Sequence, residues 1–159
     1  MILYHGSNVV VKEPRIIESD RKLDFGTGFY LTSSLGQAKR WAELTSLRRK
    51  TGLPMVSCFT FAEEFIPQLS ARIFHAADSD WLVYTARNRK DPNATDEYDL
   101  VIGPVANDNT MPVISAYYAG IYDEEETLKR LLPQRLKDQY AFKTERAVAL
   151  LTFQEVIQV

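Results

Sequence analysis

Three short stretches of the sequence hold residue types that could do chemistry together. The first is LYHGS at residues 3–7, where an imidazole at the end of an expected strand is followed by a glycine. His5 offers a ring nitrogen, and Gly6 leaves its backbone N–H and C=O uncovered, so both residues can face one ligand. Taken alone, a strand-end histidine bonded to a nearby carbonyl before a turn glycine is the simpler explanation.

The second stretch is DFGTGFYLT at residues 24–32, in which Gly26 and Gly28 flank Thr27 just before a short apolar run. Two glycines allow an unusual turn. Tyr30 then presents a flat ring suited to stacking on a planar heterocycle, and a hydroxyl that needs a polar partner. The alternative is a glycine turn that leads into a strand whose aromatic residues belong to the core.

The third stretch is DQYAFKTERAVALL at residues 138–151. Gln139 stands at the start of an expected strand, and its amide can donate and accept hydrogen bonds at once, as recognition of a pair of ribose hydroxyls requires. An exposed amide at a strand end is an equal alternative.

Composition excludes several classes of protein. The chain has 159 residues, of which 45% are hydrophobic and 25% charged, as expected for one globular domain spanning residues 1–159. The net charge of −2 gives no overall attraction to nucleic acid, and Cys58, the only cysteine, rules out an internal disulfide and a multi-cysteine metal site. With two histidines and no phosphate-loop, dinucleotide-loop, zinc-protease or serine-hydrolase motif, a metal site is not expected. No apolar segment is long enough to span a bilayer, so we expect no membrane association and a cytoplasmic protein.

The elements that must position these residues are strands and helices in mixed order, which predicts an α+β fold. Strands are expected at residues 2–5, after the glycine turn at 28–32, and at 54–62, 98–106, 139–144 and 152–159. Helices are expected at 33–52 with a serine cap and Gly52 past the basic end, at 79–90 with Ser79 as cap, at 109–120, at 123–132 before Pro133, and within 144–151. The basic clusters at 47–50 and 86–90 are expected to be solvated helix ends.

Together, the three stretches resemble the ADP-ribosyltransferase superfamily, in its histidine-tyrosine-glutamate branch, which includes the poly(ADP-ribose) polymerases and diphtheria toxin. The motifs of that branch, L-W/Y-H-G-S, G-x-G-I/F-Y-x-x and E-Y-x-x-Y-x-x-x-x-V, stand here as LYHGS, GTGFYLT and QYAFKTERAV. The resemblance covers residues 1–45 and 138–159, and a small bacterial group carries the same motifs around a segment like YDLVIGPVAND. It implies two packed small β-sheets that form a central NAD cleft with flanking helices.

The resemblance also implies roles for individual residues, with NAD as co-substrate and no metal. His5 would hold the adenosine-side ribose hydroxyl, the backbone of Gly6 would pair with the nicotinamide carboxamide, and Tyr30 would stack on the nicotinamide ring. The two glycines before Tyr30 would let the turn bring its ring against the dinucleotide. The remaining expected NAD-binding residues are Ser7, Gly28 and Trp41.

Two positions on the following helix bear on that pocket. Trp41 falls eleven residues after Tyr30, where the branch often places a second aromatic residue, although a core tryptophan at helical spacing is an equal explanation. Ala38 stands where many relatives have a serine that bonds the carboxamide, so that contact is expected to be absent.

Gln139 is the chief departure from the family, because it occupies the position of the catalytic glutamate. Cleavage of the nicotinamide glycosidic bond develops positive charge on the ribose, and a carboxylate there both orients a hydroxyl and stabilises that charge. An amide keeps only the orientation, at a cost of roughly 3 kcal/mol of transition-state stabilisation. We therefore expect transfer of single ADP-ribose units and no chain elongation. Glu145 is expected to favour a helix N-terminus instead of replacing the missing charge.

Three classes of function remain open. The first is a mono-ADP-ribosyltransferase acting on a protein or nucleic acid, with a toxin neutralised by an antitoxin as one form and an NAD glycohydrolase as a variant. The second is a module that binds NAD or ADP-ribose without turnover, and the third an interaction module that keeps only the fold. Residues 131–138 stand where the family carries its substrate-recognition loop, so Arg135 and Lys137 would either face the acceptor or be solvated. Asp108 is a weaker site candidate.

Overall fold

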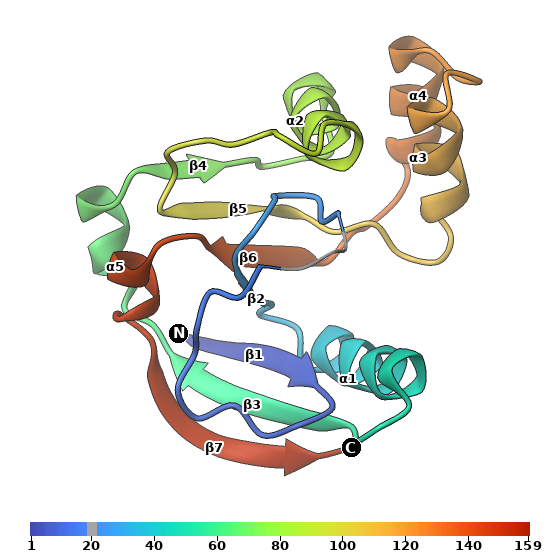
Figure 1. Cartoon of the computed structure of the whole chain (residues 1–159). Coiled ribbons are helices and arrows are strands. Elements are labelled where there is room, and N and C mark those ends of the chain that lie inside the picture. Colours follow the sequence, from blue (N-terminus) through green and yellow to red (C-terminus); the bar gives the residue numbers. More distant parts are fainter. Residues whose placement is uncertain (19–21) are drawn as a thin grey trace.

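The computed structural model describes residues 1–18 and 22–159, and its α+β architecture is built on two small sheets (Figure 1). The first sheet is antiparallel, with the order β1 (Ile2–Ser7), β3 (Met55–Thr60) and β7 (Thr152–Gln158). Because side chains alternate along a strand, His5 shares a face of β1 with Leu3 and Ser7, whereas Tyr4 and Gly6 lie on the opposite face.

The second sheet has the order β2 (Phe29–Leu31), β6 (Asp138–Phe142), β5 (Leu100–Pro104) and β4 (Ala71–Ile73). Its β4 and β5 strands run parallel, and the other pairs are antiparallel. Tyr30 pairs with Ala141, two residues from Gln139, so Tyr30 and Gln139 share a face as diagonal neighbours within reach of long side chains.

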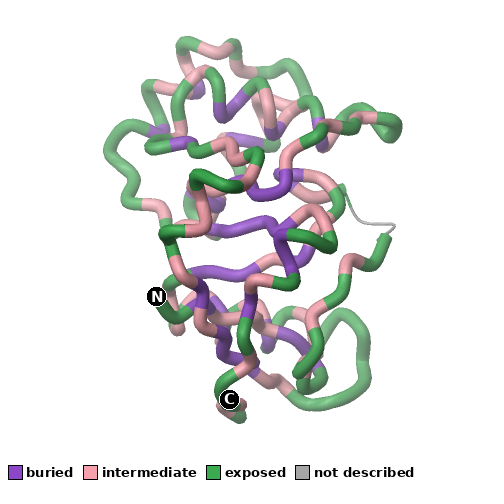
Figure 2. Tube along the Cα trace, turned by 90° about the vertical axis from the view of Figure 1, so that its left-hand side faces the viewer, coloured by how far each residue is buried: buried purple, intermediate pink, exposed green. Residues whose placement is uncertain are grey.

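The two sheets are held together by a backbone bridge and a shared core. Tyr4 and Thr32 exchange backbone hydrogen bonds of 2.9 and 3.0 Å, which joins β1 to the end of β2. One hydrophobic cluster joins aromatic residues of the second sheet to Leu3 of β1, Phe59 of β3 and Phe61, which directly follows β3. Figure 2 shows that buried stretches of the chain gather in the middle of the molecule, with exposed stretches around them.

Helix α1 (Leu35–Arg49) packs closely against β1 and β3. The hydroxyl of Ser34 accepts a hydrogen bond from the N–H of Gln37, so the expected serine cap is confirmed. The buried residues of this helix are Ala38 and Ala42, whose small side chains let the helix backbone approach Gly6. The helix ends at Arg49, because Lys50 adopts a left-handed conformation with φ of 55°.

Three helices lie on the side of the second sheet that is remote from the first sheet (Figure 1). They are α2 (Ser79–Lys90), α3 (Met111–Tyr118) and α4 (Glu124–Leu131). They bury Trp81, Ile114 and Leu131 in a second cluster with Phe25. The cap of α2 is Asp78, which accepts from the N–H of Trp81 at 3.0 Å, so the prediction of Ser79 as cap was wrong by one residue.

Short elements complete the chain. A 3₁₀ turn, η1 (Glu63–Gln68), precedes β4, and α5 (Glu145–Val148) precedes β7. Thr144 caps α5 and Glu145 occupies its first turn, as expected for an acidic residue near a helix N-terminus. Cys58 is buried in β3. Within residues 1–18 and 22–159, none of the helices has the length and apolar character needed to cross a membrane.

Candidate functional site

One cleft of about 950 Å³ collects residues from both sheets. This volume is at the upper end of the range of about 300–1,000 Å³ that is usual for small-molecule and cofactor sites. The walls come from β1, the loop before β2, α1, the end of α2 and the start of β6. All of the site residues expected from the sequence line it, namely His5, Gly6, Ser7, Gly28, Tyr30, Trp41 and Gln139.

His5 is held in the cleft wall by a stacking contact of its ring and by its Nδ1 atom. The ring stacks on Phe29 with centroids 4.2 Å apart, and Nδ1 lies 2.8 Å from the backbone carbonyl oxygen of Tyr30. A carbonyl only accepts, so Nδ1 carries the proton and Nε2 of the neutral ring is an acceptor. Burial lowers the pKa of His5 to about 4, although the Tyr30 carbonyl partly opposes this shift. The neutral acceptor form therefore prevails at neutral pH.

Gly6 presents backbone groups at an open strand edge. The strand β1 lies at the edge of its sheet and pairs with β3 on one side only. Because Tyr4 directs its N–H and C=O away from β3 toward Thr32, strand alternation directs the N–H and C=O of Gly6 to the same side, beyond that bridge. A donor and an acceptor side by side complement a primary carboxamide.

The same glycine is required by packing. A Cβ atom on Gly6 would lie 2.0 Å from the carbonyl oxygen of Ala38 and 2.8 Å from the amide nitrogen of Ala42. Helix α1 could not keep its position against any larger residue. The bare backbone of Gly6 thus serves the helix contact on one face of β1 and remains available at the strand edge.

The glycine turn before β2 is locked by the hydroxyl of Tyr30. That hydroxyl donates to the carbonyl of Gly26 at 2.6 Å and accepts from the N–H of Phe25 at 3.1 Å. Burial first, and then the nearby carboxylate of Asp24, raise the pKa of Tyr30 well above its usual value near 10. The phenol therefore stays protonated, and its polar end is committed to the turn while the residue lines the cleft.

Both turn glycines have local reasons within the fold. Gly26 adopts a left-handed conformation with φ of 79°, which residues with a side chain rarely adopt. A Cβ atom on Gly28 would lie 3.0 Å from the carbonyl oxygen of Phe142 on the neighbouring strand. The close approach that Gly28 permits is therefore to the protein's own backbone, and Gly26 supplies the left-handed conformation of the turn that leads to Tyr30.

Trp41 differs from the tryptophan in the core. It is partly exposed on α1 and lines the cleft, so the alternative of a core tryptophan does not hold. Trp81, by contrast, is fully buried and donates from Nε1 to the carbonyl of Pro104 at 3.0 Å. Ser7 is buried at the end of β1, where its hydroxyl donates to the side chain of Asn8.

Gln139 is buried at the start of β6, with 3% of its surface exposed, so it is not a solvated strand-end amide. Its Nε2 donates to Oδ2 of Asp24 at 3.1 Å and to the carbonyl oxygen of Pro104 at 3.2 Å. Glu145, six residues after Gln139, is exposed in α5 and does not line the cleft.

Asp24 is the cleft residue that the sequence did not reveal. Its Oδ1 accepts from Nε and Nη2 of Arg89, each at 2.8 Å, and its side chain is 7% exposed. The prediction that residues 86–90 form a solvated helix end is therefore wrong for Arg89, which lines the cleft. The cluster at 47–50 is exposed at the end of α1, as predicted, and its Arg49 also lines the cleft and donates to Asn8 Oδ1 at 2.9 Å.

A buried ion pair supports the glycine turn from behind. Nζ of Lys143 lies 2.7 Å from Oδ2 of Asp96, and it donates to the carbonyl of Phe25 at 2.6 Å. Burial opposes ionisation of Asp96, but hydrogen bonds from Lys143 and Tyr84 outweigh it and lower the pKa of this carboxyl. Lys143 follows directly after β6, so the strand that carries Gln139 also fixes the loop that carries Asp24.

Other residues singled out from the sequence lie outside the cleft. Arg135 and Lys137 are exposed before β6, which agrees with a solvated loop. Asp108 is exposed and forms a 3.2 Å ion pair with Arg40 at the surface. None of these three residues borders the cleft.

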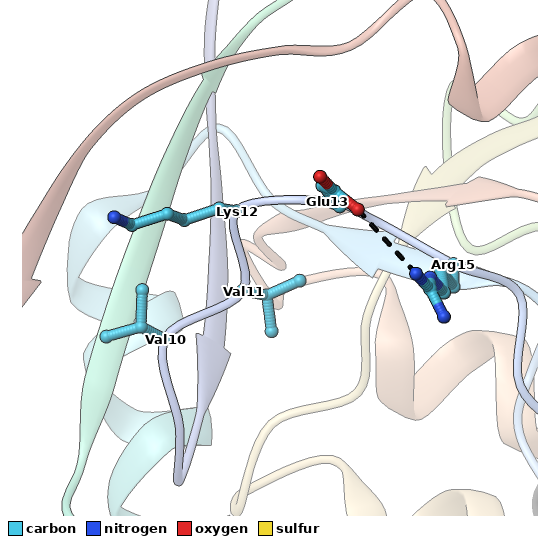
Figure 3. A pocket seen from close by; sticks show the side chains of 5 residues that line it. All are labelled: Val10, Val11, Lys12, Glu13 and Arg15. Atoms are coloured by element: carbon cyan, nitrogen blue, oxygen red, sulfur yellow. Dashed lines mark ion pairs between the residues drawn. The ribbon is translucent and has the colours of Figure 1, made fainter.

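A second hollow of about 470 Å³ lies against the loop that follows β1 (Figure 3). Its walls are Val10, Val11, Lys12, Glu13 and Arg15, and Glu13 and Arg15 form a 3.6 Å ion pair. All of the residues that line this hollow come from one short loop. We therefore place the site in the larger cleft, which Val11, Glu13 and Arg15 of the same loop also line.

These features define an α+β protein with a cleft to which both sheets contribute, and no three His, Cys, Asp or Glu side chains among the described residues are grouped to hold a metal ion. The chain belongs to the family described as "Protein of unknown function (DUF3990)", whose model matches residues 1–153. No curated protein and no solved structure matches the chain.

Proposed function

We propose that this chain is an NAD-dependent mono-ADP-ribosyltransferase with an ADP-ribosyltransferase-like fold. The observation that carries the proposal is the convergence of His5, Tyr30 and Gln139 on one cleft, although these residues are far apart in the sequence. The motifs that contain them resemble the histidine-tyrosine-glutamate branch of that superfamily. The cleft volume also fits a dinucleotide-sized ligand.

The chemistry of the cleft walls agrees with the parts of NAD. The N–H and C=O of Gly6 at the edge of β1 match the carboxamide of nicotinamide, and the ring of Tyr30 offers a stacking surface for the pyridinium. The acceptor Nε2 of His5 suits a ribose hydroxyl. Arg49 brings positive charge from the end of α1 to the cleft, which suits a diphosphate.

In the proposed reaction, nicotinamide leaves C1′ of its ribose with the bonding electron pair and becomes neutral. A nucleophilic atom of the acceptor forms the new bond to C1′ and loses its proton to solvent. Gln139 would accept a hydrogen bond from the ribose and so hold the sugar in place. We propose a protein or nucleic acid as acceptor, and a bacterial toxin neutralised by an antitoxin as the biological setting.

The test is nicotinamide release from NAD by the purified chain, compared with a His5→Ala, Tyr30→Ala double variant. Thermal melting of both proteins checks that the variant is folded. A wild-type rate no higher than that of a folded double variant would remove the enzyme proposal. Labelled NAD with a bacterial lysate then shows whether protein, RNA or DNA acquires label, and release without labelling identifies water as acceptor.

The neutral side chain at position 139 favours one alternative, a module that binds NAD or ADP-ribose without turnover. The lost charge stabilisation of roughly 3 kcal/mol acts on the transition state and leaves ground-state binding intact. Calorimetry with NAD distinguishes the outcomes. Binding without nicotinamide release supports this alternative, and no heat at millimolar NAD argues against both NAD-binding functions.

A further inference from the structure

We infer that Asp24 is a positioning residue for this site, which holds the amide of Gln139 in the orientation that leaves Oε1 as the acceptor in the cleft. The inference rests on the proposed function. Asp24 lies in the loop before β2, lines the cleft, and is bonded to Gln139 across 115 positions of sequence.

The orientation follows from the chemistry of the two partners. Nε2 of Gln139 faces a carboxylate oxygen of Asp24 and the carbonyl oxygen of Pro104, and both of these atoms only accept hydrogen bonds. A half-turn of the amide would place Oε1 against both acceptors. Oδ2 of Asp24 would then lose its donor, and the Pro104 carbonyl would keep only the bond from Trp81. Placing an acceptor against these two oxygens is costly where the side chain is only 3% exposed. The amide therefore has one favourable orientation.

This orientation leaves Oε1 of Gln139 as a free acceptor. Both hydrogens of Nε2 are used, and no donor among the described residues bonds to Oε1. A ribose hydroxyl in the cleft would thus meet an acceptor, as it would at a glutamate. Without Asp24, the amide would keep one of its two fixed acceptors and could turn its donor end toward the ribose.

Helix α2 holds both acceptors in place. Arg89 donates twice to Oδ1 of Asp24, and Nδ2 of Asn88 donates to the backbone carbonyl of Asp24 at 3.0 Å. Trp81 donates to the same Pro104 carbonyl that receives Gln139. Arg89 forms an ion pair with Asp24 and so offsets its negative charge. We therefore assign Asp24 the role of orienting the amide, and not that of replacing the missing negative charge at position 139.

The first experiment compares nicotinamide release by the wild-type chain and Asp24→Asn. An asparagine can both donate and accept, so it bonds Gln139 in either orientation. We expect kcat to fall about tenfold, the effect of one lost hydrogen bond of about 1.4 kcal/mol, with KM for NAD changed less than about twofold. Asp80→Asn is the matched control. Asp80 is exposed at the start of α2, so this substitution makes the same chemical change away from the cleft.

The second experiment repeats Asp24→Asn in a Gln139→Glu background. In Gln139→Glu two carboxylates face each other at the 3.1 Å contact, and like charges disfavour the ionised glutamate. Asp24→Asn removes that repulsion and offers a donor, so we expect it to raise kcat there although it lowers kcat beside Gln139. A merely structural Asp24 would lower kcat and the melting temperature in both backgrounds, and that result would overturn the inference.

The two proposals fail in different ways. A folded wild-type chain that releases no nicotinamide above the His5→Ala, Tyr30→Ala level removes the proposed function and this inference with it. An active wild-type chain with Asp24→Asn at an unchanged kcat removes the inference alone. The side-chain amide resonances of Gln139 in a ¹⁵N-labelled protein without NAD give a readout besides activity, and no shift of these resonances in Asp24→Asn also overturns it.

Discussion

The carbonyl oxygen of Ala38 lies 2.0 Å from the point that a Cβ atom on Gly6 would occupy. The distance between β1 and α1 is therefore set by a residue without a side chain. This close approach fixes Trp41 and Arg49, further along α1, relative to His5 on the opposite face of β1. The cleft depends on a backbone contact as much as on its polar groups.

Gly6→Ala is expected to destabilise the protein by about 1–3 kcal/mol, because α1 must move away from β1. Chemical denaturation measures the free energy of unfolding. Gly36→Ala is the matched control: it lies in the first turn of α1 with no contact closer than 3.9 Å, so alanine there should stabilise by about 0.5–1 kcal/mol. Equal effects of the two substitutions would show that the contact at Gly6 is relieved at no cost.

Tyr30→Phe should weaken the glycine turn while keeping the ring. The loss of the bonds to Gly26 and Phe25 is expected to cost about 1–3 kcal/mol of unfolding free energy. If only the ring contacts the ligand, the dissociation constant for NAD measured by calorimetry stays within about threefold of wild type. Tyr122→Phe is the control, because it removes the same hydroxyl from a ring that lies under Arg130. A folded Tyr30→Phe protein with much weaker NAD binding would instead show that the hydroxyl contacts the ligand.

His5 should make the protein less stable in acid. Its pKa is about 4 in the folded chain, below the ordinary value of 6.5, so the unfolded chain binds the proton first as pH falls. The contribution of His5 to the free energy of unfolding is therefore at its maximum above pH 6.5. It decreases as the pH falls toward 4, by at most about 3 kcal/mol. His5→Asn keeps a donor for the Tyr30 carbonyl but does not titrate. Unfolding free energies measured from pH 4.5 to 8 should therefore fall more steeply in the wild type than in this variant.

Breaking the buried ion pair between Lys143 and Asp96 should be strongly destabilising. Lys143→Met leaves an unpaired carboxylate that is 8% exposed, at an expected cost of about 3–5 kcal/mol. Arg130→Met, in the exposed pair with Glu126, should cost less than about 1 kcal/mol. A double variant with Asp96→Asn should lose less than the sum of the single losses. Additive losses would mean that the two groups do not stabilise each other.

The parts of the fold that could be predicted from sequence are those specified by local pattern. Strand β1, helix α1 with its Ser34 cap, and strand β3 follow from alternation, helical spacing and cap chemistry within a few residues. Strand β4 and the turn η1 were missed. β4 has three residues, too few to show a period, and it exists because β5 pairs with it. The predicted cap of α2, Ser79, lies one residue after the observed cap, Asp78, because aspartate and serine are both good capping residues.

The candidate site divides in the same way. The resemblance of three motifs to a known superfamily pointed to His5, Tyr30 and Gln139, which all line the cleft. Asp24 could not be recognised, because its importance comes from partners 65 and 115 positions away, and nothing in DFGTG marks an aspartate as buried. Arg89 was misjudged for the same reason, since a basic residue in a last helical turn is usually explained by the helix dipole and solvent.

The position of β6 in the second sheet determines when the site can form during synthesis. This strand lies between β2 and β5, yet it is the last of the four to be translated. Until residue 142 has left the ribosome, β2 has no strand partner in that sheet, and neither Gln139 nor Lys143 is present to bond Asp24 or the Phe25 carbonyl. A nascent chain therefore carries the histidine and tyrosine of the cleft well before it carries the strand that completes the cleft wall.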